Sequence, residues 1–296
     1  MGSFSSSPPT LPPGPSDSPA VVERGTAGPG SDIIRSTANP LLKRARKLRQ
    51  RKHRDGTGTF LAEGVQPVWQ ALEQRAPVEV ILLSEDLLSS EAALEIVREH
   101  ERRGVTVARL SGGAFATIAQ REHPSGLAAI VGMDRLALDD LEVKETSLFV
   151  ALHGVSNPGN LGAIVRTVDA VSGAGILLIG DTTDPWHPSA VKASMGTLFG
   201  VPVCRTSSEA TLKWRERHRM QLITTSAAGE DSYVSAGYLL PAIALFGSEG
   251  EGLPDQLEQA GDLSVRIPMS GAASSLNLAV SAGVLLYEIK RVVGDA

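Results

Sequence analysis

Residues 267–293, IPMSGAASSLNLAVSAGVLLYEIKRVV, decide how we interpret the rest of the chain. They leave an expected strand at residues 263–267, turn through Gly and Ser residues, and enter a long apolar helix. Ser274 or Ser275 is expected to cap this helix, because a serine hydroxyl can accept one of the unpaired N–H groups of the first turn. With Asn277 they form a polar cluster at an electropositive helix end, which suits a small ligand. A capped core helix without a ligand is the alternative reading of this stretch.

The expected helix is apolar around much of its circumference. One face is predicted to be buried, because four of its apolar residues recur at helical spacing: Leu276, Val280, Val284 and Tyr287. A second apolar set broadens this surface: Leu278, Ala282, Leu285 and Ile289. Lys290 and Arg291 suit the negative end of the helix dipole, and Gly294 follows as a C-terminal cap.

Composition limits the classes of protein to which the chain can belong. It has 296 residues, 42% of them hydrophobic, which allows one large or two ordinary domains with a real core. No apolar run reaches the length of a membrane span, so no membrane association is expected. Cys204 is the single cysteine, which excludes an internal disulfide and favours a reducing, cytoplasmic location. No Cys/His cluster has the spacing of zinc ligands, so no metal is expected.

The net charge of −5 conceals a local concentration of basic residues. Eight of the 28 Lys and Arg residues lie between positions 43 and 54 with no acid among them, and an apolar stripe predicts one helix from Asn39 to about His53. Such a density favours contact with a polyanion, although a solvated basic helix face is the alternative. The predicted phosphate-binding residues are Lys43, Arg46, Arg49, Arg51, Lys52 and Arg54.

The chain divides into four predicted segments. Residues 1–34 are rich in Ser, Pro and Gly and are expected to be disordered, and they lack the features of a secretory signal. Residues 35–132 alternate helical and strand patterns and predict a small α/β domain. Residues 133–146 are polar and acidic and are interpreted as a linker. Residues 147–296 hold continuous apolar strands separated by helices, which predicts an α/β fold with a parallel sheet covered on both faces.

Three loops that follow strands of this last domain carry the candidate chemistry, since ligands of parallel sheets bind beyond the carboxyl ends of strands. The first, NPGNLGAIVR at residues 157–166, places Asn160 near a helix start and Arg166 six residues later. Asp169 is the structural partner expected for this arginine if it has no chemical role. The second, LFGSEGEGLP at residues 245–254, is rich in glycine. Its Glu residues would repel phosphate, and it lacks the Lys-Ser/Thr of a P-loop. The third is the opening stretch.

The order of these loops resembles the three signature motifs of the SpoU (TrmH) family. Members of this family are S-adenosylmethionine-dependent RNA ribose 2′-O-methyltransferases of the SPOUT superfamily. The motifs are NPGNLGAIVR, LFGSEGEGL and RIPM-(x)5-SLN-(x)4-A. The match covers about residues 148–293, and residues 39–131 look like the family's N-terminal RNA-binding domain of ribosomal-protein L30e type. One departure is Asn157, where many relatives have Asp, and it is expected to affect turn capping rather than chemistry.

The resemblance implies properties that the residue pattern by itself does not reveal. The C-terminal domain should contain a trefoil knot, which general topology rules disfavour. The protein should be a homodimer with its active site at the subunit interface. S-adenosylmethionine should be held by residues at three strand ends and before the last helix: Thr225, Ser226, Ala227, Gly247, Ile267, Met269, Ser275 and Leu276.

The resemblance also implies catalytic roles. Relatives often use the arginine of the first motif, here Arg166, as a base, but a guanidinium is not readily deprotonated. A clamp on the adjacent phosphate, or stabilisation of the developing alkoxide, is physically easier. Four further residues are expected to orient the ribose and the arginine: Asn160, Glu249, Ser275 and Asn277.

Several functional readings stay open. The N-terminal domain favours 23S ribosomal RNA as substrate, with resistance to a ribosome-directed antibiotic as one biological role, and transfer RNA is the alternative substrate. A different class of function is also open: a non-catalytic RNA-binding or ribosome-assembly protein that retains the fold. A nucleotide-binding oxidoreductase ranks far lower, because the dinucleotide-binding glycines are absent and the basic segment would be unexplained.

Overall fold

The computed structural model describes residues 33–294 with the exception of residue 121. The disordered tail expected at residues 1–34 therefore lies outside the described residues, apart from its last two positions. Ile34 forms an isolated parallel bridge with Leu110, and its backbone N–H donates to the carbonyl of Arg109 at 2.9 Å. Regular backbone pairing is therefore already present at Ile34, one of the last two residues of the segment that was predicted to be disordered.

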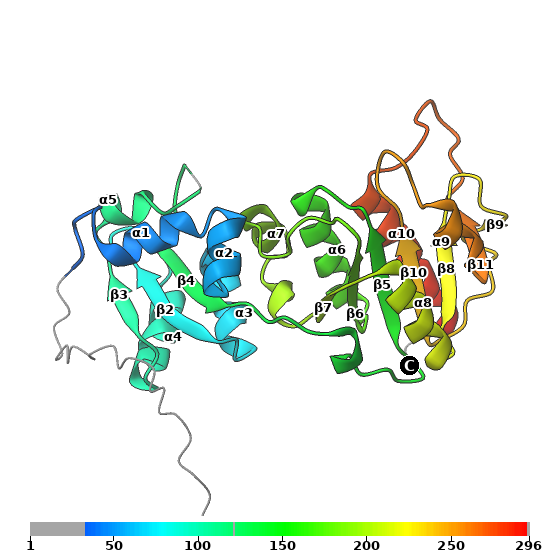
Figure 1. The fold of residues 1–296 in the computed structure, drawn as a ribbon. Coiled ribbons are helices and arrows are strands. Elements are labelled where there is room, and N and C mark those ends of the chain that lie inside the picture. Colours follow the sequence, from blue (N-terminus) through cyan, green and yellow to red (C-terminus); the bar gives the residue numbers. More distant parts are fainter. Residues whose placement is uncertain (1–32, 121, 295–296) are drawn as a thin grey trace, which may run out of the picture. The chain divides into compact units, whose positions relative to one another are not determined.

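The first half of the described chain builds a four-stranded sheet (Figure 1). Its strand order is β1 (Thr59–Glu63), β4 (Leu127–Gly132), β2 (Val78–Leu83) and β3 (Val107–Arg109). Strand β4 runs antiparallel to both its neighbours, whereas β2 and β3 are parallel. Helices cover both faces: α1 (Pro40–Lys47) and α5 (Gly112–Ala116) on one, and α3 (Val65–Glu73) and α4 (Glu91–Arg102) on the other.

Two details of this region differ from the sequence-based prediction. The single basic helix expected to end near His53 is two helices, α1 and α2 (Arg51–Thr57), separated by a turn at residues 48–50. Helix α2 therefore extends beyond the predicted end near His53, and Gly58 ends it in the left-handed conformation, with φ of 64°. Strand β1 was not predicted, because its short sequence TFLAE is buried on both faces and shows no alternation.

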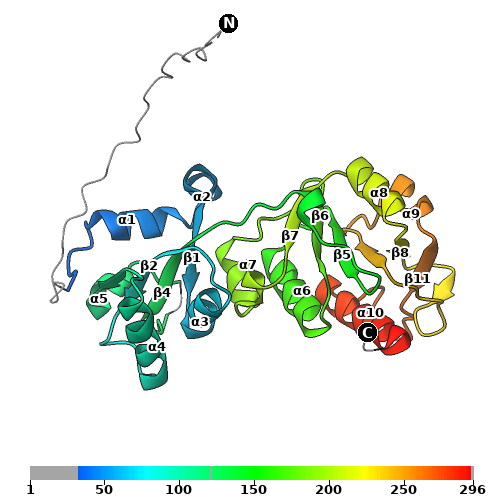
Figure 2. The same cartoon turned by 90° about the horizontal axis from the view of Figure 1, so that it is seen from below.

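The second half builds a seven-stranded sheet in which every pairing is parallel, as predicted. Its strand order is β7 (Val203–Thr206), β6 (Gly175–Ile179), β5 (Leu148–His153), β10 (Ala242–Phe246), β8 (Gln221–Thr225), β11 (Leu263–Arg266) and β9 (Asp231–Ser232). Helices α6 (Pro158–Ala170) and α10 (Leu278–Val293) cover one face, and α8 (Ser208–Arg217) and α9 (Asp255–Gln259) cover the other (Figure 2). The expected trefoil knot stays a prediction.

Shorter elements complete this half. Between β6 and β7 lies a short helix, α7 (Pro188–Ala193), followed by the 3-10 turn η2 (Thr197–Phe199). Gly196 separates them because it adopts φ of 93°, which helical residues do not. The predicted linker at residues 133–146 contains a 3-10 turn, η1 (Leu138–Asp140). Strand β9 and helix α9 were not predicted from their short sequences.

The last helix differs from the prediction in both its start and its buried face. It begins at Leu278, and its cap is Asn277, whose side-chain oxygen accepts from the N–H of Ala279 at 3.0 Å. The serines at 274 and 275 precede it in an exposed segment. The buried apolar residues are Leu278, Ala282, Leu285, Leu286 and Ile289, whereas Val280 and Tyr287 of the predicted face are 51% and 59% exposed. The packing of α10 against α6 and the sheet selects the second apolar set.

The thiol of Cys204 on β7 is predicted to be unreactive in the folded protein. Its side chain is fully buried in a cluster with Trp214, and burial, with the negative charge of Asp140, raises the pKa of the thiol to about 11. Because the thiolate is the reactive form, a chromogenic disulfide reagent at pH 8 should react slowly with the native protein and stoichiometrically after unfolding in urea. Equal rates in the two states would contradict this burial.

Candidate active site

The candidate site lies at the carboxyl ends of neighbouring parallel strands. Strand β10 pairs with β5 on one side and with β8 on the other, and β8 also pairs with β11. The loops that follow β5, β10 and β11 are the three motifs singled out in the sequence. The loop after β8 adds a fourth segment at the same edge. Parallel pairing therefore brings together segments that are more than 100 residues apart.

A cavity of about 780 Å³ opens among these loops. Its volume lies within the range typical of small-molecule sites. All eight residues predicted to bind a cofactor line it: Thr225, Ser226, Ala227, Gly247, Ile267, Met269, Ser275 and Leu276. The structure thus gathers them around one space.

Gly247 allows the chain to fold tightly at the floor of this cavity. A Cβ atom added at this position would lie 2.1 Å from the carbonyl carbon of Gly252. Ser248 and Gly252 exchange two backbone hydrogen bonds of 3.1 Å, which close the loop. The result is a compact turn that holds the carboxylates of Glu249 and Glu251 at the cavity.

A chain of side-chain hydrogen bonds connects the three motifs. The Asn277 Nδ2 donates to the Oδ1 of Asn160 at 3.1 Å, and the Nδ2 of Asn160 donates to the Oε1 of Glu249 at 2.5 Å. Asn157 fixes the backbone at the start of α6, where Asn160 lies. Its Oδ1 accepts from the N–H groups of Gly159 and Asn160 and so caps the helix. Three of the five predicted catalytic residues are therefore in direct contact, and Ser275 lines the adjoining cavity.

Arg166 lies on α6, about 9 Å further along the helix axis than Asn160. Its side chain is exposed, and across residues 33–294, leaving out residue 121, it has no hydrogen bond or ion pair. The structural alternative, an ion pair with Asp169, is therefore not formed. The structure leaves this guanidinium available for a ligand, but it does not bring it into contact with the other four residues.

The charge of the cavity favours a cationic ligand. Three carboxylates line it, those of Glu249, Glu251 and Glu258. The one arginine among its lining residues, Arg266, donates to the backbone carbonyls of Gly229 and Glu230 at 2.6 and 2.5 Å. Three glutamates against one arginine leave the cavity lining with an excess of negative charge.

Sequence reasoning missed several lining residues. Ser281 and Leu285 of α10 face the cavity together with Leu278, and Leu253 and Glu258 reach it from the segment after the glycine-rich loop. The position of Ser281 could have been predicted, because it lies four residues after Asn277 and therefore on the same side of the helix. The glutamate of α9 had no such signal, since α9 itself was not predicted.

The basic segment is only partly exposed. Lys43, Arg51 and Lys52 are exposed on α1 and α2. Arg46 and Arg49 donate to backbone carbonyls, of Thr37 and of Ile118 and Ala119 respectively. Arg54 was predicted to contact phosphate, but it is 1% exposed and forms an ion pair with Asp184. The prediction is wrong for Arg54, because charge density along a helix does not reveal which side chain faces inward.

No helix within residues 33–294 is long and apolar enough to cross a membrane. Among the same described residues, no group of three or more His, Cys, Asp or Glu side chains is arranged to hold a metal ion.

Comparison with known proteins places these features in a family. Residues 147–287 match the family model described as the SpoU rRNA Methylase family, and residues 39–129 match the MRM3-like substrate binding domain. A 23S rRNA (uridine(2479)-2′-O)-methyltransferase of Streptomyces viridochromogenes is 30% identical, over 90% of this chain and 95% of that protein. A 23S rRNA (guanosine(2553)-2′-O)-methyltransferase of Bacillus subtilis is 27% identical, over 87% of this chain and 98% of that protein.

A solved structure agrees with these sequence matches. The AdoMet-bound rRNA methyltransferase of Sinorhizobium meliloti superposes with a TM-score of 0.81 at 33% identity. The match covers 90% of this chain and 99% of that one.

Proposed function

Because the chain belongs to the SpoU methylase family, we propose that it transfers a methyl group from S-adenosylmethionine to a ribose 2′-hydroxyl of RNA. The observation that carries this proposal is the amide bridge of Asn160, which joins Glu249 of the cavity lining to Asn277. Large-subunit ribosomal RNA is the proposed substrate, since the two relatives described above are named as 23S rRNA methyltransferases.

The residues present fit S-adenosylmethionine. When bound, this cofactor supplies an electrophilic methyl group on a positively charged sulfur. The cavity offers three carboxylates for a cation, and its walls include backbone at Gly247, Ile267 and Leu276 that can hold an adenosine. Close approach of backbone to a ligand is favoured where glycine forms the wall. We assign the eight lining residues predicted from the sequence to cofactor binding.

The chain's own residues would position the ribose rather than perform difficult covalent chemistry. Transfer needs the 2′-oxygen in line with the methyl carbon, and positioning of this kind supplies much of the rate. Asn160, Asn277 and Ser275 provide hydrogen bonds for the ribose, and Glu249 fixes the Asn160 amide. The Arg166 guanidinium would donate hydrogen bonds to the 2′-oxygen and stabilise its developing negative charge as the hydroxyl proton leaves to solvent.

We assign residues 35–132 to RNA binding, residues 133–146 to the linker and residues 147–296 to catalysis. The match of residues 39–129 to a substrate binding domain supports the first assignment. The exposed side chains of Lys43, Arg51 and Lys52 are the proposed phosphate contacts. Arg46 and Arg49 contribute charge, although their hydrogen bonds to backbone also hold the domain together.

Neutralising these exposed cations should weaken RNA binding without affecting the cofactor. In the variant Lys43→Gln, Arg51→Gln, Lys52→Gln, the dissociation constant for RNA should rise about tenfold or more, and the slope of its logarithm against salt should fall. Filter binding across a salt series measures both quantities.

A matched control removes the same charge elsewhere. Helix α4, on the opposite face of the sheet, carries three exposed arginines that pair with its own glutamates: Arg98, Arg102 and Arg103. Their replacement by glutamine should leave the salt slope close to that of the unaltered protein. If the two triple variants lose the same RNA affinity, the loss comes from net charge alone. That result would contradict a specific RNA-binding surface on α1 and α2.

A homodimer is part of the proposal. An apolar stripe on α10, formed by Val280, Val284 and Tyr287, lies beside the cavity residues of the same helix and is largely exposed. Exposed apolar surface of this kind is typical of an interface. A second copy of the chain would cover the stripe and bring its own residues close to the active site. A cytoplasmic location, where ribosomes assemble, follows from the proposed substrate.

The decisive experiment offers radiolabelled S-adenosylmethionine with unmodified ribosomal RNA and, separately, bulk transfer RNA. Label on ribose in 23S rRNA alone is the expected result. If the label appears only in transfer RNA, transfer RNA is the substrate instead of 23S rRNA. Cofactor binding without label in either RNA would favour a non-catalytic assembly protein. Resistance to a ribosome-directed antibiotic stays a prediction, which growth of cells carrying the active gene would test.

A further inference from the structure

The most deeply buried charge of the basic segment does not belong to the proposed phosphate contacts. Arg54, on α2, is 1% exposed. Its Nη1 donates to the carbonyls of Leu48 and Arg49, at 2.8 and 2.9 Å, in the turn between α1 and α2. Its Nε and Nη2 donate to a single oxygen of Asp184 at 3.0 and 2.6 Å. The guanidinium therefore stiffens the basic segment and connects it to another part of the chain.

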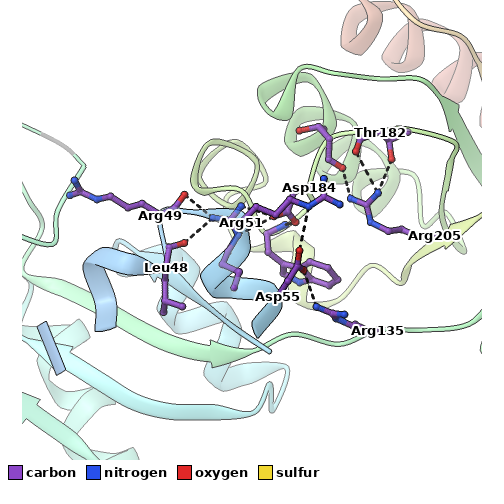
Figure 3. Close-up of polar contacts among 11 residues, drawn as sticks. Leu48, Arg49, Arg51, Asp55, Arg135, Thr182, Asp184 and Arg205 are labelled. Atoms are coloured by element: carbon purple, nitrogen blue, oxygen red, sulfur yellow. Dashed lines mark hydrogen bonds and ion pairs between the residues drawn. The ribbon is translucent and has the colours of Figure 1, made fainter. Parts of the chain in front are cut away.

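Asp184 belongs to the half of the chain that carries the active site. It lies between β6 and α7 and is 6% exposed. Its second oxygen accepts from the N–H of Trp186 at 2.9 Å, so both carboxylate oxygens are used. Figure 3 shows that the neighbouring segment is fixed as well, because Arg205 of β7 reaches the hydroxyl of Thr182 at 3.2 Å. The same guanidinium donates to the carbonyl of Thr183 at 2.8 Å.

Apolar contacts accompany this ion pair. The ring of Phe60 on β1 stacks on that of Phe199 in η2, with centroids 5.8 Å apart. Val191 of α7 is buried in the cluster that covers β1 and α3. A Cβ atom on Gly196 would lie 2.7 Å from the Cβ of Gln70 and 3.2 Å from the carbonyl oxygen of Gln66, so Gly196 lies close against α3. The four-stranded region is thus in contact with the segment between β6 and β7.

The ion pair restricts the relative orientation of the surfaces that make these contacts. Apolar surfaces attract each other over a range of orientations, whereas a buried, fully hydrogen-bonded ion pair tolerates few. Burying two charges costs desolvation that their attraction often only offsets, so such a pair is a weak source of stability. The pair instead fixes geometry, because four hydrogen bonds from one guanidinium hold α1, α2 and the β6–α7 segment together.

We propose that Arg54 and Asp184 are positioning residues, which set the basic segment at a fixed distance from the methyl-transfer site. The proposal rests on the proposed function. RNA held by Lys43, Arg51 and Lys52 would then present one ribose to the cavity and not its neighbours. Loss of the pair should leave cofactor binding intact and reduce productive RNA binding.

A distance measurement tests the geometry directly. Spin labels are placed on two exposed lysines, through Lys47→Cys on α1 and Lys213→Cys on α8, while buried Cys204 stays unlabelled. Labelled protein is diluted with excess unlabelled protein, so that pairs within one chain dominate even in a dimer. Double electron–electron resonance should give a narrow distance distribution, which broadens or shifts when Asp184→Asn is added. An unchanged distribution in the folded variant would overturn the proposal.

Kinetics then separates positioning from general damage. In Asp184→Asn, kcat/KM for RNA should fall about 10- to 100-fold, mainly through KM, because RNA that cannot engage the basic segment and the methyl-transfer site at the same time binds productively with lower affinity. The dissociation constant for S-adenosylmethionine should stay within twofold. Glu209→Gln, which removes an exposed ion pair on α8, is the control and should alter neither. Unchanged kcat/KM in the folded Asp184→Asn protein would refute the positioning role.

A second variant protects the test against misfolding. Arg54→Lys keeps the charge but cannot donate to Asp184 and to both carbonyls at once, so it should give a smaller change in the same direction. If Asp184→Asn does not fold, Arg54→Lys is used for the same measurements. Full activity of Arg54→Lys with an unaltered distance distribution would then overturn the proposal. If the unaltered protein methylates no RNA, the proposed function fails, whereas the distance measurement still decides whether the pair fixes the arrangement.

Discussion

Replacing Arg166 by alanine should lower kcat for RNA methylation about 100- to 1,000-fold, the range seen when one donor that stabilises a developing oxyanion is removed. Cofactor affinity should stay within twofold, because Arg166 is not among the residues that line the cavity. Stability should change little, since this side chain is exposed and is held by no hydrogen bond or ion pair within the described residues. Single-turnover assays with preformed enzyme and RNA measure the effect.

Two companion variants make this prediction specific. Asp169→Ala removes an exposed charge one turn further along α6 and should retain full activity. Arg166→Lys keeps the charge but loses the planar fork, so it should lie between the unaltered protein and Arg166→Ala. A near-full rate in Arg166→Lys would rule out a fork-shaped role, and a near-full rate in Arg166→Ala would remove this residue from the mechanism.

Gly247→Ala should reduce the affinity for S-adenosylmethionine at least 100-fold, equivalent to about 2.8 kcal/mol of binding free energy. The new methyl group would lie 2.1 Å from one backbone atom of Gly252 and 2.5 Å from the nitrogen of Leu253, so the loop has to open. Opening breaks the paired hydrogen bonds of Ser248 and Gly252 and displaces the cavity wall. Isothermal titration calorimetry measures the affinity.

The same loop offers a matched control. A Cβ atom on Gly250 would meet nothing within 4 Å, and its backbone is not in the left-handed region. Gly250→Ala should therefore bind the cofactor within a fewfold of the unaltered protein. If both alanine variants lose affinity equally, the effect comes from general stiffening of the loop, and the steric argument for Gly247 is wrong.

The sequence was sufficient to predict the parallel sheet and eight of the residues that line the cavity. Apolar strands such as residues 148–152 and 242–246 could be recognised one by one, and parallel pairing requires their following loops to meet at one edge. The motif resemblance then named the residues within those loops, and all eight predicted cofactor residues line one cavity. Local pattern and topology were enough because each motif directly follows a strand or precedes a helix.

Other features depend on tertiary contacts that no local pattern contains. The face of α10 was assigned wrongly, because the helix is apolar on two sides and only packing against α6 distinguishes them. Arg54 was placed with the phosphate contacts because its carboxylate partner lies 130 residues away. The hydrogen bonds of Asn160 were likewise unforeseen, since its partners lie 89 and 117 residues along the chain.

The link between Asn277 and Asn160 consists of two uncharged amides, and this affects how the enzyme should respond to acidity. Amides neither gain nor lose protons in the physiological range, so this half of the bridge keeps its donors and acceptors at any pH at which the protein is folded. Of the three bridged side chains, only Glu249 is a titratable group. A change in activity with acidity that arises within the bridge therefore reports on that one carboxylate.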